Sequence, residues 1–157
     1  MGDIVFNIAK GRVNELVLRT IGDDPSTAEI VVMLCTGTET DGTLQDFDTF
    51  AAILAGNLAE ATFTNYAREI LDESSGGLSS TTDDTNNRRE SDASDITYSS
   101  AGGAANNTLT RLIFGYDASG AGTDSGIVPL TAHDFAETTT GSDLIAQFAS
   151  TGWFRAA

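Results

Sequence analysis

The stretch Ile30-Val31-Val32-Met33-Leu34-Cys35 places six apolar side chains in a row. A run of this kind, rich in β-branched side chains and shorter than most helices, is typical of a strand that is covered on both faces. We therefore expect residues 30–35 to form the central strand of the core. Cys35, the only cysteine, is expected to be a small buried hydrophobe rather than a nucleophile.

Short apolar runs separated by Gly, Asn, Asp and Ser lie on both sides of this stretch, and that pattern is typical of strands joined by turns. Residues 13–21 fit either a short helix or an irregular strand that ends before Pro25. A helical spacing also fits Phe63, Tyr66, Ala67, Ile70 and Leu71, but the Thr and aromatic content of residues 62–66 favours a strand. The other expected strands are residues 4–8, 96–98, 108–116, 127–130 and 144–148.

Helical periodicity is clearest over residues 44–58, where apolar residues recur at steps of three and four and so share one face. Thr43 and Asp46 have the spacing of a capping box at its start, and Gly56-Asn57 is a stop signal. The whole pattern predicts one domain over residues 1–157. Its fold class is mainly β with one or two short helices (α+β), around a β-sandwich or β-barrel-like core.

Residues 74–95 contain almost no apolar side chain. A segment of this composition cannot be ordered by burial of a hydrophobic face, and long loops of this kind are usually functional or mobile. We therefore expect an extended loop or arm over about residues 74–95.

The charge balance is strongly acidic, because Asp and Glu total 23 against 8 Lys and Arg, which gives a formal net charge of -15. Such a surface repels phosphate backbones, so no direct nucleic-acid partner is expected. No stretch approaches the roughly 20 apolar residues of a membrane-spanning helix, and the N-terminal residues lack the pattern of a secretory signal. We expect a protein made in the cytoplasm, with no membrane partner.

Candidate residues for catalysis or metal binding are few. His133, the only histidine, precedes Asp134, but neighbouring side chains of a strand point to opposite faces and no Gly-x-Ser-x-Gly elbow is present, so a structural histidine is expected. One Cys and one His exclude the usual zinc sites. The acidic stretches 83–87 and 117–124 offer oxygen ligands but lack the calcium-loop pattern. We expect no catalytic residue, no metal site and no cofactor.

Several phrases of the sequence resemble a family of small proteins encoded among the virion-structure genes of actinobacterial tailed bacteriophages. The resemblance implies a virion structural protein of minor-capsid or decoration type and carries over no catalytic residues. Its phrases cover most of the chain: Phe6-Asn7-Ile8-Ala9-Lys10-Gly11-Arg12, Leu44-Gln45-Asp46-Phe47-Asp48, Tyr66-Ala67-Arg68, Asp83-Asp84-Thr85-Asn86-Asn87-Arg88 and Ile127-Val128-Pro129-Leu130-Thr131-Ala132-His133-Asp134-Phe135.

The resulting hypothesis is a non-enzymatic capsid decoration protein on the virion exterior, whose partners are the major capsid protein and other copies of itself. A homotrimer at a local three-fold is expected, since cyclic symmetry closes such interfaces. The residues expected to contact partners come from the arm and the C-terminal end, because arginine and aromatic side chains are enriched at interfaces. They are Arg88, Arg89, Trp153, Phe154 and Arg155.

Two other functions are also consistent with the sequence. The first is a tail or head–tail connector protein, which is also structural but confined to the vertex or the tail. The second is a host-surface carbohydrate-binding module, which would need an exposed aromatic platform. Trp153 and Tyr98 are the residues that could form one, and both are expected in the core instead.

Overall fold

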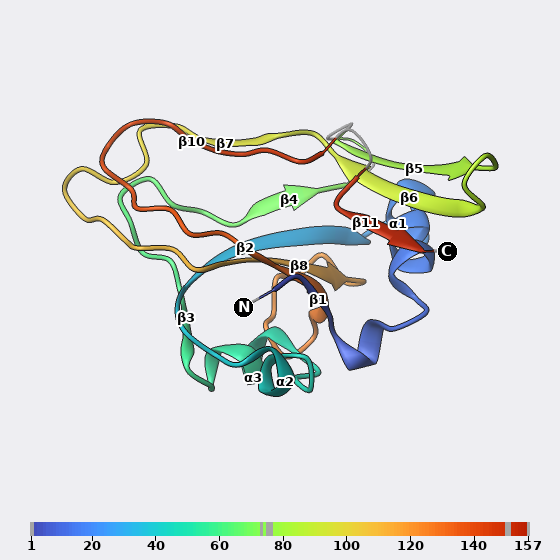
Figure 1. Ribbon diagram of the computed structural model, residues 1–157, viewed down its shortest axis with the longest axis horizontal. Coiled ribbons are helices and arrows are strands. Elements are labelled where there is room, and N and C mark those ends of the chain that lie inside the picture. The colour runs from blue at the N-terminus through green and yellow to red at the C-terminus, as the bar shows by residue number, and fades with distance from the viewer. Residues whose placement is uncertain (1, 73, 75–76, 150–151, 157) are drawn as a thin grey trace.

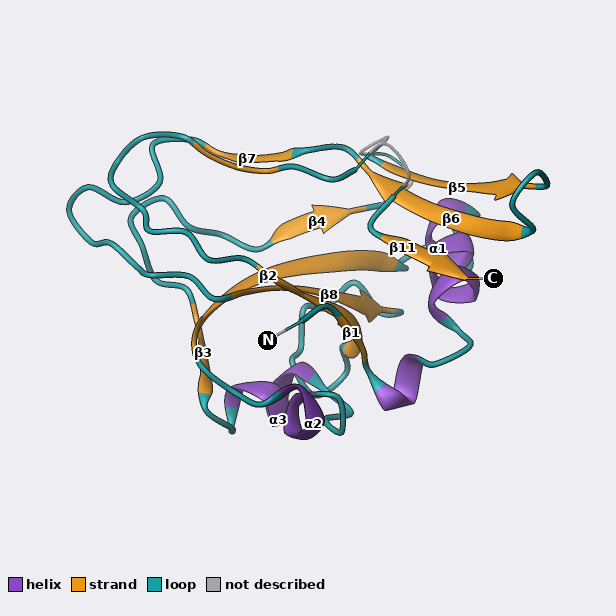
Figure 2. Cartoon of the chain, viewed as in Figure 1, coloured by secondary structure: helices purple, strands orange, loops and turns teal. Residues whose placement is uncertain are grey.

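The computed structural model of the protein describes residues 2–72, 74, 77–149 and 152–156. Its main feature is a six-stranded antiparallel sheet with the order β1-β9-β8-β2-β3, in which β4 also pairs with β2 (Figure 2). The strands of this sheet are β1 (Ile4–Val5), β2 (Glu29–Gly37), β3 (Leu58–Glu60), β4 (Glu69–Leu71), β8 (Arg111–Asp117) and β9 (Val128–Asp134). A mainly β fold with short helices is thereby confirmed.

Strand β2 is the central strand, as its unbroken apolar run predicted. Residues 30–35 are fully buried, and β2 pairs with β8 along one edge and with β3 and β4 along the other. The expected strand at 108–116 corresponds to β8, which begins at Arg111, and the one at 127–130 corresponds to the longer β9. The buried sheet centre is therefore the part of the fold that the sequence located best.

The two faces of the sheet are covered by different parts of the chain. On one face, the ring of Phe114 in β8 contacts the rings of Phe148 and Trp153 from the C-terminal segment. On the other face, a Cβ atom at Gly115 would lie 2.5 Å from the ring of Phe50, so helix α3 (Phe50–Leu54) packs directly on the backbone there. Figure 1 shows α2 and α3 on this side of the sheet.

Residues 13–21, left open between helix and strand, form helix α1 (Val13–Ile21) with Val13, Leu16 and Val17 buried. The expected strand over 4–8 was too long, because β1 ends at Val5. The chain then turns into the 3-10 helix η1 (Asn7–Ala9), and the backbone N–H of Asn7 donates to the carbonyl of Gln45.

The prediction of one helix over 44–58 was wrong. This segment holds the end of helix α2 (Asp41–Leu44), then α3, and then the start of β3. Thr40 and Thr49 each have extended backbones and accept a hydrogen bond from the N–H three residues later, so each begins a new helix. A second N-cap in the middle of the segment explains why the apolar periodicity does not continue as one helix.

Residues 62–66 form a turn and not the expected strand. Asn65 has a positive φ of 70°, which a continuous strand does not allow. The rings of Phe63 and Tyr66 pack with each other and with that of Tyr98, and the Tyr66 hydroxyl accepts a hydrogen bond from the N–H of Leu34. The aromatic content here therefore serves a local cluster instead of a pleated strand.

The expected loop over 74–95 is in fact a β-hairpin, which is a further correction. Strands β5 (Leu78–Asp83) and β6 (Arg88–Ala93) pair antiparallel, and β11 (Phe154–Ala156) pairs with the other edge of β6. Backbone pairing and polar contacts order most of this sheet, and Leu78, Ala93 and Phe154 pack against the hydrophobic core. Among the polar contacts, Ser91 donates from its hydroxyl to Oδ1 of Asn14 in α1. Residues 73, 75 and 76 lie outside the described part of the chain.

A third, two-stranded sheet pairs β7 (Ile96–Tyr98) with β10 (Leu144–Ala146), in agreement with two of the expected strands. In Figure 1 this sheet and the β11-β6-β5 sheet lie on the side of the main sheet that faces away from α2 and α3.

Candidate functional site

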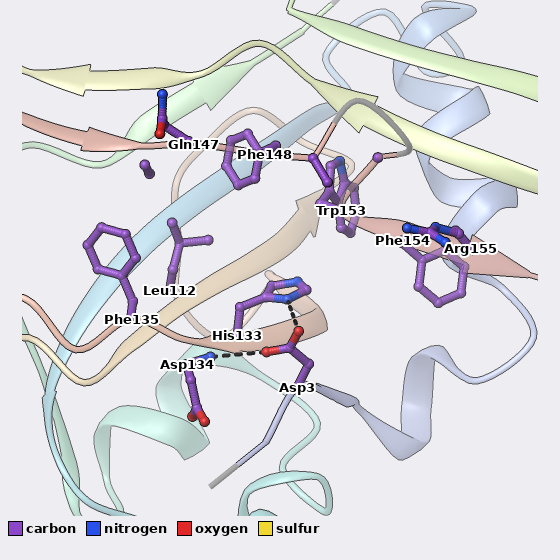
Figure 3. A pocket seen from close by; sticks show the side chains of 13 residues that line it. Asp3, Leu112, His133, Asp134, Phe135, Gln147, Phe148, Trp153, Phe154 and Arg155 are labelled. Atoms are coloured by element: carbon purple, nitrogen blue, oxygen red, sulfur yellow. Dashed lines mark hydrogen bonds and ion pairs between the residues drawn. The ribbon is translucent and has the colours of Figure 1, made fainter.

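A pocket of about 500 Å³ lies where the end of β9 meets the segment that leads into β11. Figure 3 shows one side of the pocket formed by His133, which lies in β9, and by Phe135, which follows β9. The other side is formed by Phe148, Trp153 and Arg155 of the C-terminal segment. Asp3, which precedes β1, closes the lower side. The pocket thus brings together residues from both ends of the described chain.

His133 is held at the floor of the pocket by two polar contacts. Its Nδ1 lies 3.4 Å from Oδ2 of Asp3, and its Nε2 lies 3.0 Å from the hydroxyl of Thr131. Burial lowers the pKa of His133 below the ordinary 6.5, because the charged imidazolium loses hydration, although Asp3 opposes the shift. The imidazole is therefore held in place by Asp3 and Thr131 and is neutral over most of the physiological pH range.

The order of hydroxyl, imidazole and carboxylate in Thr131, His133 and Asp3 matches that of a nucleophilic relay. However, Thr131 is only 1% exposed, so its hydroxyl is not accessible to a substrate. Asp134, the carboxylate next to His133 in sequence, points away from the imidazole and pairs with Arg111 at 2.7 Å (Figure 3). The arrangement positions the imidazole but does not offer a nucleophile.

Trp153 forms a wall of the pocket and a large contact with the main sheet. Its ring stacks on that of Phe114, with the centroids 4.0 Å apart and the planes 5° from parallel. Trp153 is 8% exposed and Tyr98 is 3% exposed, so both belong to the core, as expected. Neither is an exposed aromatic platform of the kind that a carbohydrate-binding module would use.

The five residues expected to contact partners gather in one region. Phe154 and Arg155 lie on β11 next to Trp153, and β11 pairs with β6, which carries Arg88 and Arg89. The register of the two strands places Arg155 opposite Glu90 and Ala156 opposite Arg89. The β11-β6-β5 sheet and the pocket beside it therefore hold every residue of that set.

The guanidinium groups of β6 already have contacts within the chain. Arg88 bridges Asp83 at 3.1 Å and Glu90 at 2.7 Å. Arg89 donates from Nε to the hydroxyl of Ser80 at 2.9 Å and from Nη1 to the hydroxyl of Thr82. Both arginines thus hold the hairpin together, and any contact with a partner would share groups that are already hydrogen-bonded.

Arg111 is a prominent buried residue that sequence reasoning did not select. It is fully buried and binds three separate parts of the chain: the carboxylate of Asp41, the carboxylate of Asp134 and, at 2.7 Å, the carbonyl of Gly2. Buried arginine is stable only when such partners are present. All seven residues of β8 are buried, so position 111 lies in the core, but the partners of Arg111 lie far away in sequence.

The acidic loops considered for calcium use their carboxylates to hold turns. Asp83 accepts hydrogen bonds from the backbone and side-chain amides of Asn86. Asp117 accepts hydrogen bonds from Ser119 and from the backbone N–H of Gly122. In the described ranges, no cluster of three or more His, Cys, Asp or Glu side chains is arranged to hold a metal ion.

Cys35 is fully buried in β2, and burial raises its pKa to about 12. A thiol in this state is neutral at physiological pH and unreactive.

None of the helices in the part of the chain that the structure describes has the length and apolar character needed to cross a bilayer. No protein-family model matches this chain, and searches of curated proteins and of solved structures gave no match either.

Proposed function

We propose that this chain is a non-enzymatic structural protein of a tailed bacteriophage particle, which binds the outer face of the capsid and reinforces it. Its main partner is the major capsid protein, and its second partner is another copy of itself in a small homo-oligomer. Each copy stabilises the shell by the surface that it buries against the capsid, and icosahedral symmetry repeats this contact at every equivalent position.

The observation that carries the proposal is the gathering of Arg88, Arg89, Phe154 and Arg155 on the β11-β6-β5 sheet, next to the pocket that the buried Trp153 lines. Arginine and aromatic side chains are the residue types that contribute most to protein interfaces. The resemblance of several sequence segments to virion proteins of tailed bacteriophages supports this kind of particle. The net charge of -15 supports a place on the exterior, away from packaged DNA.

The direct test is composition and imaging of purified particles. The proposal expects the chain in purified virions by mass spectrometry, with cryo-electron density repeated over the shell. Density confined to the vertex or the tail would replace decoration with the connector role. A chain that is abundant in infected cells but missing from purified virions would remove the virion role altogether.

A binding experiment tests the sheet itself. Particles that lack the protein are mixed with purified wild type, Arg155→Ala or Arg12→Ala. Arg155→Ala should bind about ten-fold more weakly, as an interface arginine does when truncated. Arg12 is the matched control, because it is a half-exposed arginine at the start of α1 whose partner is Glu15 of the same helix. Equal weakening by both variants would show a general charge effect instead of a contact at this sheet.

A further inference from the structure

Strand β5 has one edge without a partner among the described strands. It is the outermost strand of the β11-β6-β5 sheet, and six residues of it pair with β6. The carbonyl of Gly77 accepts a hydrogen bond from the N–H of Ser94, which makes this a hydrogen-bonded pair. Because the ladder alternates, backbone groups of every second residue point to the open edge. These residues are Leu78, Ser80 and Thr82.

Residues 78–82 of β5 themselves lack the features that usually protect a free strand from pairing, although Nη2 of Arg89 donates to the Ser80 carbonyl at 3.3 Å. Natural edge strands carry lysine, proline or a bulge, or they are very short. Residues 78–82 contain no charge and no proline, although the protein as a whole carries a net charge of -15. The neighbouring strand β6, whose edges are both paired, carries Arg88, Arg89, Glu90 and Asp92. Residues 78–82 of the exposed strand are thus neutral, which favours an edge that is covered in the working protein.

We infer that β5 pairs antiparallel with β5 of a second copy, so that the two three-stranded sheets join into one six-stranded sheet across a two-fold axis. In both copies, backbone groups of every second residue of β5 point to the open edge. In the joined sheet, each of these residues must lie opposite another such residue, so that their N–H and C=O groups can bond. Near the middle of the strand, the registers that satisfy this condition place Ser80 opposite Ser80, or Thr81 opposite Thr81.

Both registers pair hydroxyl side chains, and Ser and Thr pairs are favourable across strands. Both also keep like charges apart. Asp83, at the end of β5, lies opposite Gly77 or Ser79 of the other copy, and the two Asp83 side chains are about 14 to 20 Å apart along the strands. That spacing exceeds the Debye length of roughly 8 Å at physiological salt. A parallel, in-register pairing would instead place the two Asp83 residues side by side.

The helix behind the hairpin offers an apolar contact for the same interface. Helix α1 packs mainly against β5. Asn14 accepts the hydrogen bond from Ser91 of β6, so the side of α1 that carries Asn14 faces the hairpin. Leu18 lies one helical turn after Asn14 on that side, yet it is 39% exposed. A second sheet joined at β5 brings its own α1 to the same face, where it would cover Leu18.

The test traps the pairing with cysteines in the purified protein. Ser80→Cys and Thr81→Cys are each placed at one of the two self-paired positions, and Thr97→Cys is the control. Thr97 is also an exposed threonine on a strand, but it lies on β7, and native Cys35 is buried and does not interfere. Under mild oxidation, Ser80→Cys or Thr81→Cys should form disulfide-linked dimers about ten-fold faster than Thr97→Cys.

A second variant separates the contact from a folding defect. Thr81→Asp adds a charge directly opposite its symmetry mate in the Thr81 register and diagonal to it, about 7–8 Å away, in the Ser80 register. Because Thr81 also lies opposite Glu90 of β6, the circular dichroism spectrum must show that the hairpin stays folded. Thr81→Asp should shift the mass measured by light scattering from two chains toward one, whereas Thr97→Asp should leave that mass unchanged, with equal circular dichroism spectra for both.

Equal cross-linking of all three cysteine variants, or a three-chain mass that Thr81→Asp does not change, would overturn the pairing. The experiment uses the protein in solution, so its failure leaves the virion role standing, and loss of the virion role leaves the pairing standing.

Discussion

Replacement of Trp153 tests how strongly the C-terminal segment is bound to the main sheet. Trp153 is 8% exposed and stacks on Phe114 at 4.0 Å. Truncation of a buried aromatic side chain costs about 3–5 kcal/mol, because the transferred surface is lost and a cavity remains. For a domain of this size, about 2–4 °C is lost per kcal/mol, so Trp153→Ala should lower the melting temperature by roughly 6–20 °C.

A matched variant separates stacking from polar contacts. The indole Nε1 of Trp153 is buried and has no hydrogen-bond partner among the residues that the structure describes. Trp153→Phe therefore keeps a ring on Phe114 and gives up no hydrogen bond, so it should cost only about 1–2 kcal/mol.

Urea unfolding followed by circular dichroism gives both values, since fluorescence is lost with the only tryptophan. A loss below about 1 kcal/mol for Trp153→Ala, or equal losses for the two variants, would show that the stacked contact does not bind the segment.

Three more predictions follow from the core. Gly115→Ala should destabilise by about 1–3 kcal/mol in urea unfolding, because its new Cβ would lie 2.5 Å from the Phe50 ring, and Phe50→Leu should recover part of this loss. The folded protein holds the pKa of His133 below 6.5, so the unfolded state binds more protons near that pH. Stability should therefore fall as the pH drops below about 6.5, and His133→Gln should flatten this slope in thermal unfolding at several pH values. Cys35, with its pKa raised to about 12, should react with a thiol reagent only after unfolding, and rapid reaction of the native protein would contradict its burial.

Local periodicity located the elements whose order depends on their own side chains. The apolar run at 30–35 is the buried centre of β2, and the alternation at 96–98 and 144–148 located β7 and β10, although β10 ends at Ala146. It misjudged elements whose ends depend on a single polar group. Thr49 begins a new helix by accepting one hydrogen bond, and that bond divides a stripe of apolar residues that otherwise suits one continuous helix.

The hairpin at 78–93 was out of reach of the same reasoning, because its order comes from partners elsewhere in the chain. Backbone pairing with β11 and the bond between Ser91 and Asn14 join segments that are far apart in sequence. The candidate site has the same character. Arginine and aromatic content selected Arg155 and Trp153, but nothing local to His133 indicated that Asp3 would be its carboxylate partner.

The sequence by itself determined the β-rich class, the central strand and the burial of Cys35 and Trp153, because hydrophobicity and strand period act over a few neighbouring residues. Only the tertiary structure shows that the hairpin is ordered, that β5 has an open edge, and that buried Arg111 binds Asp41, Asp134 and the Gly2 carbonyl. Those features depend on hydrogen bonds and ion pairs between distant segments, and such contacts exist only once the chain has folded.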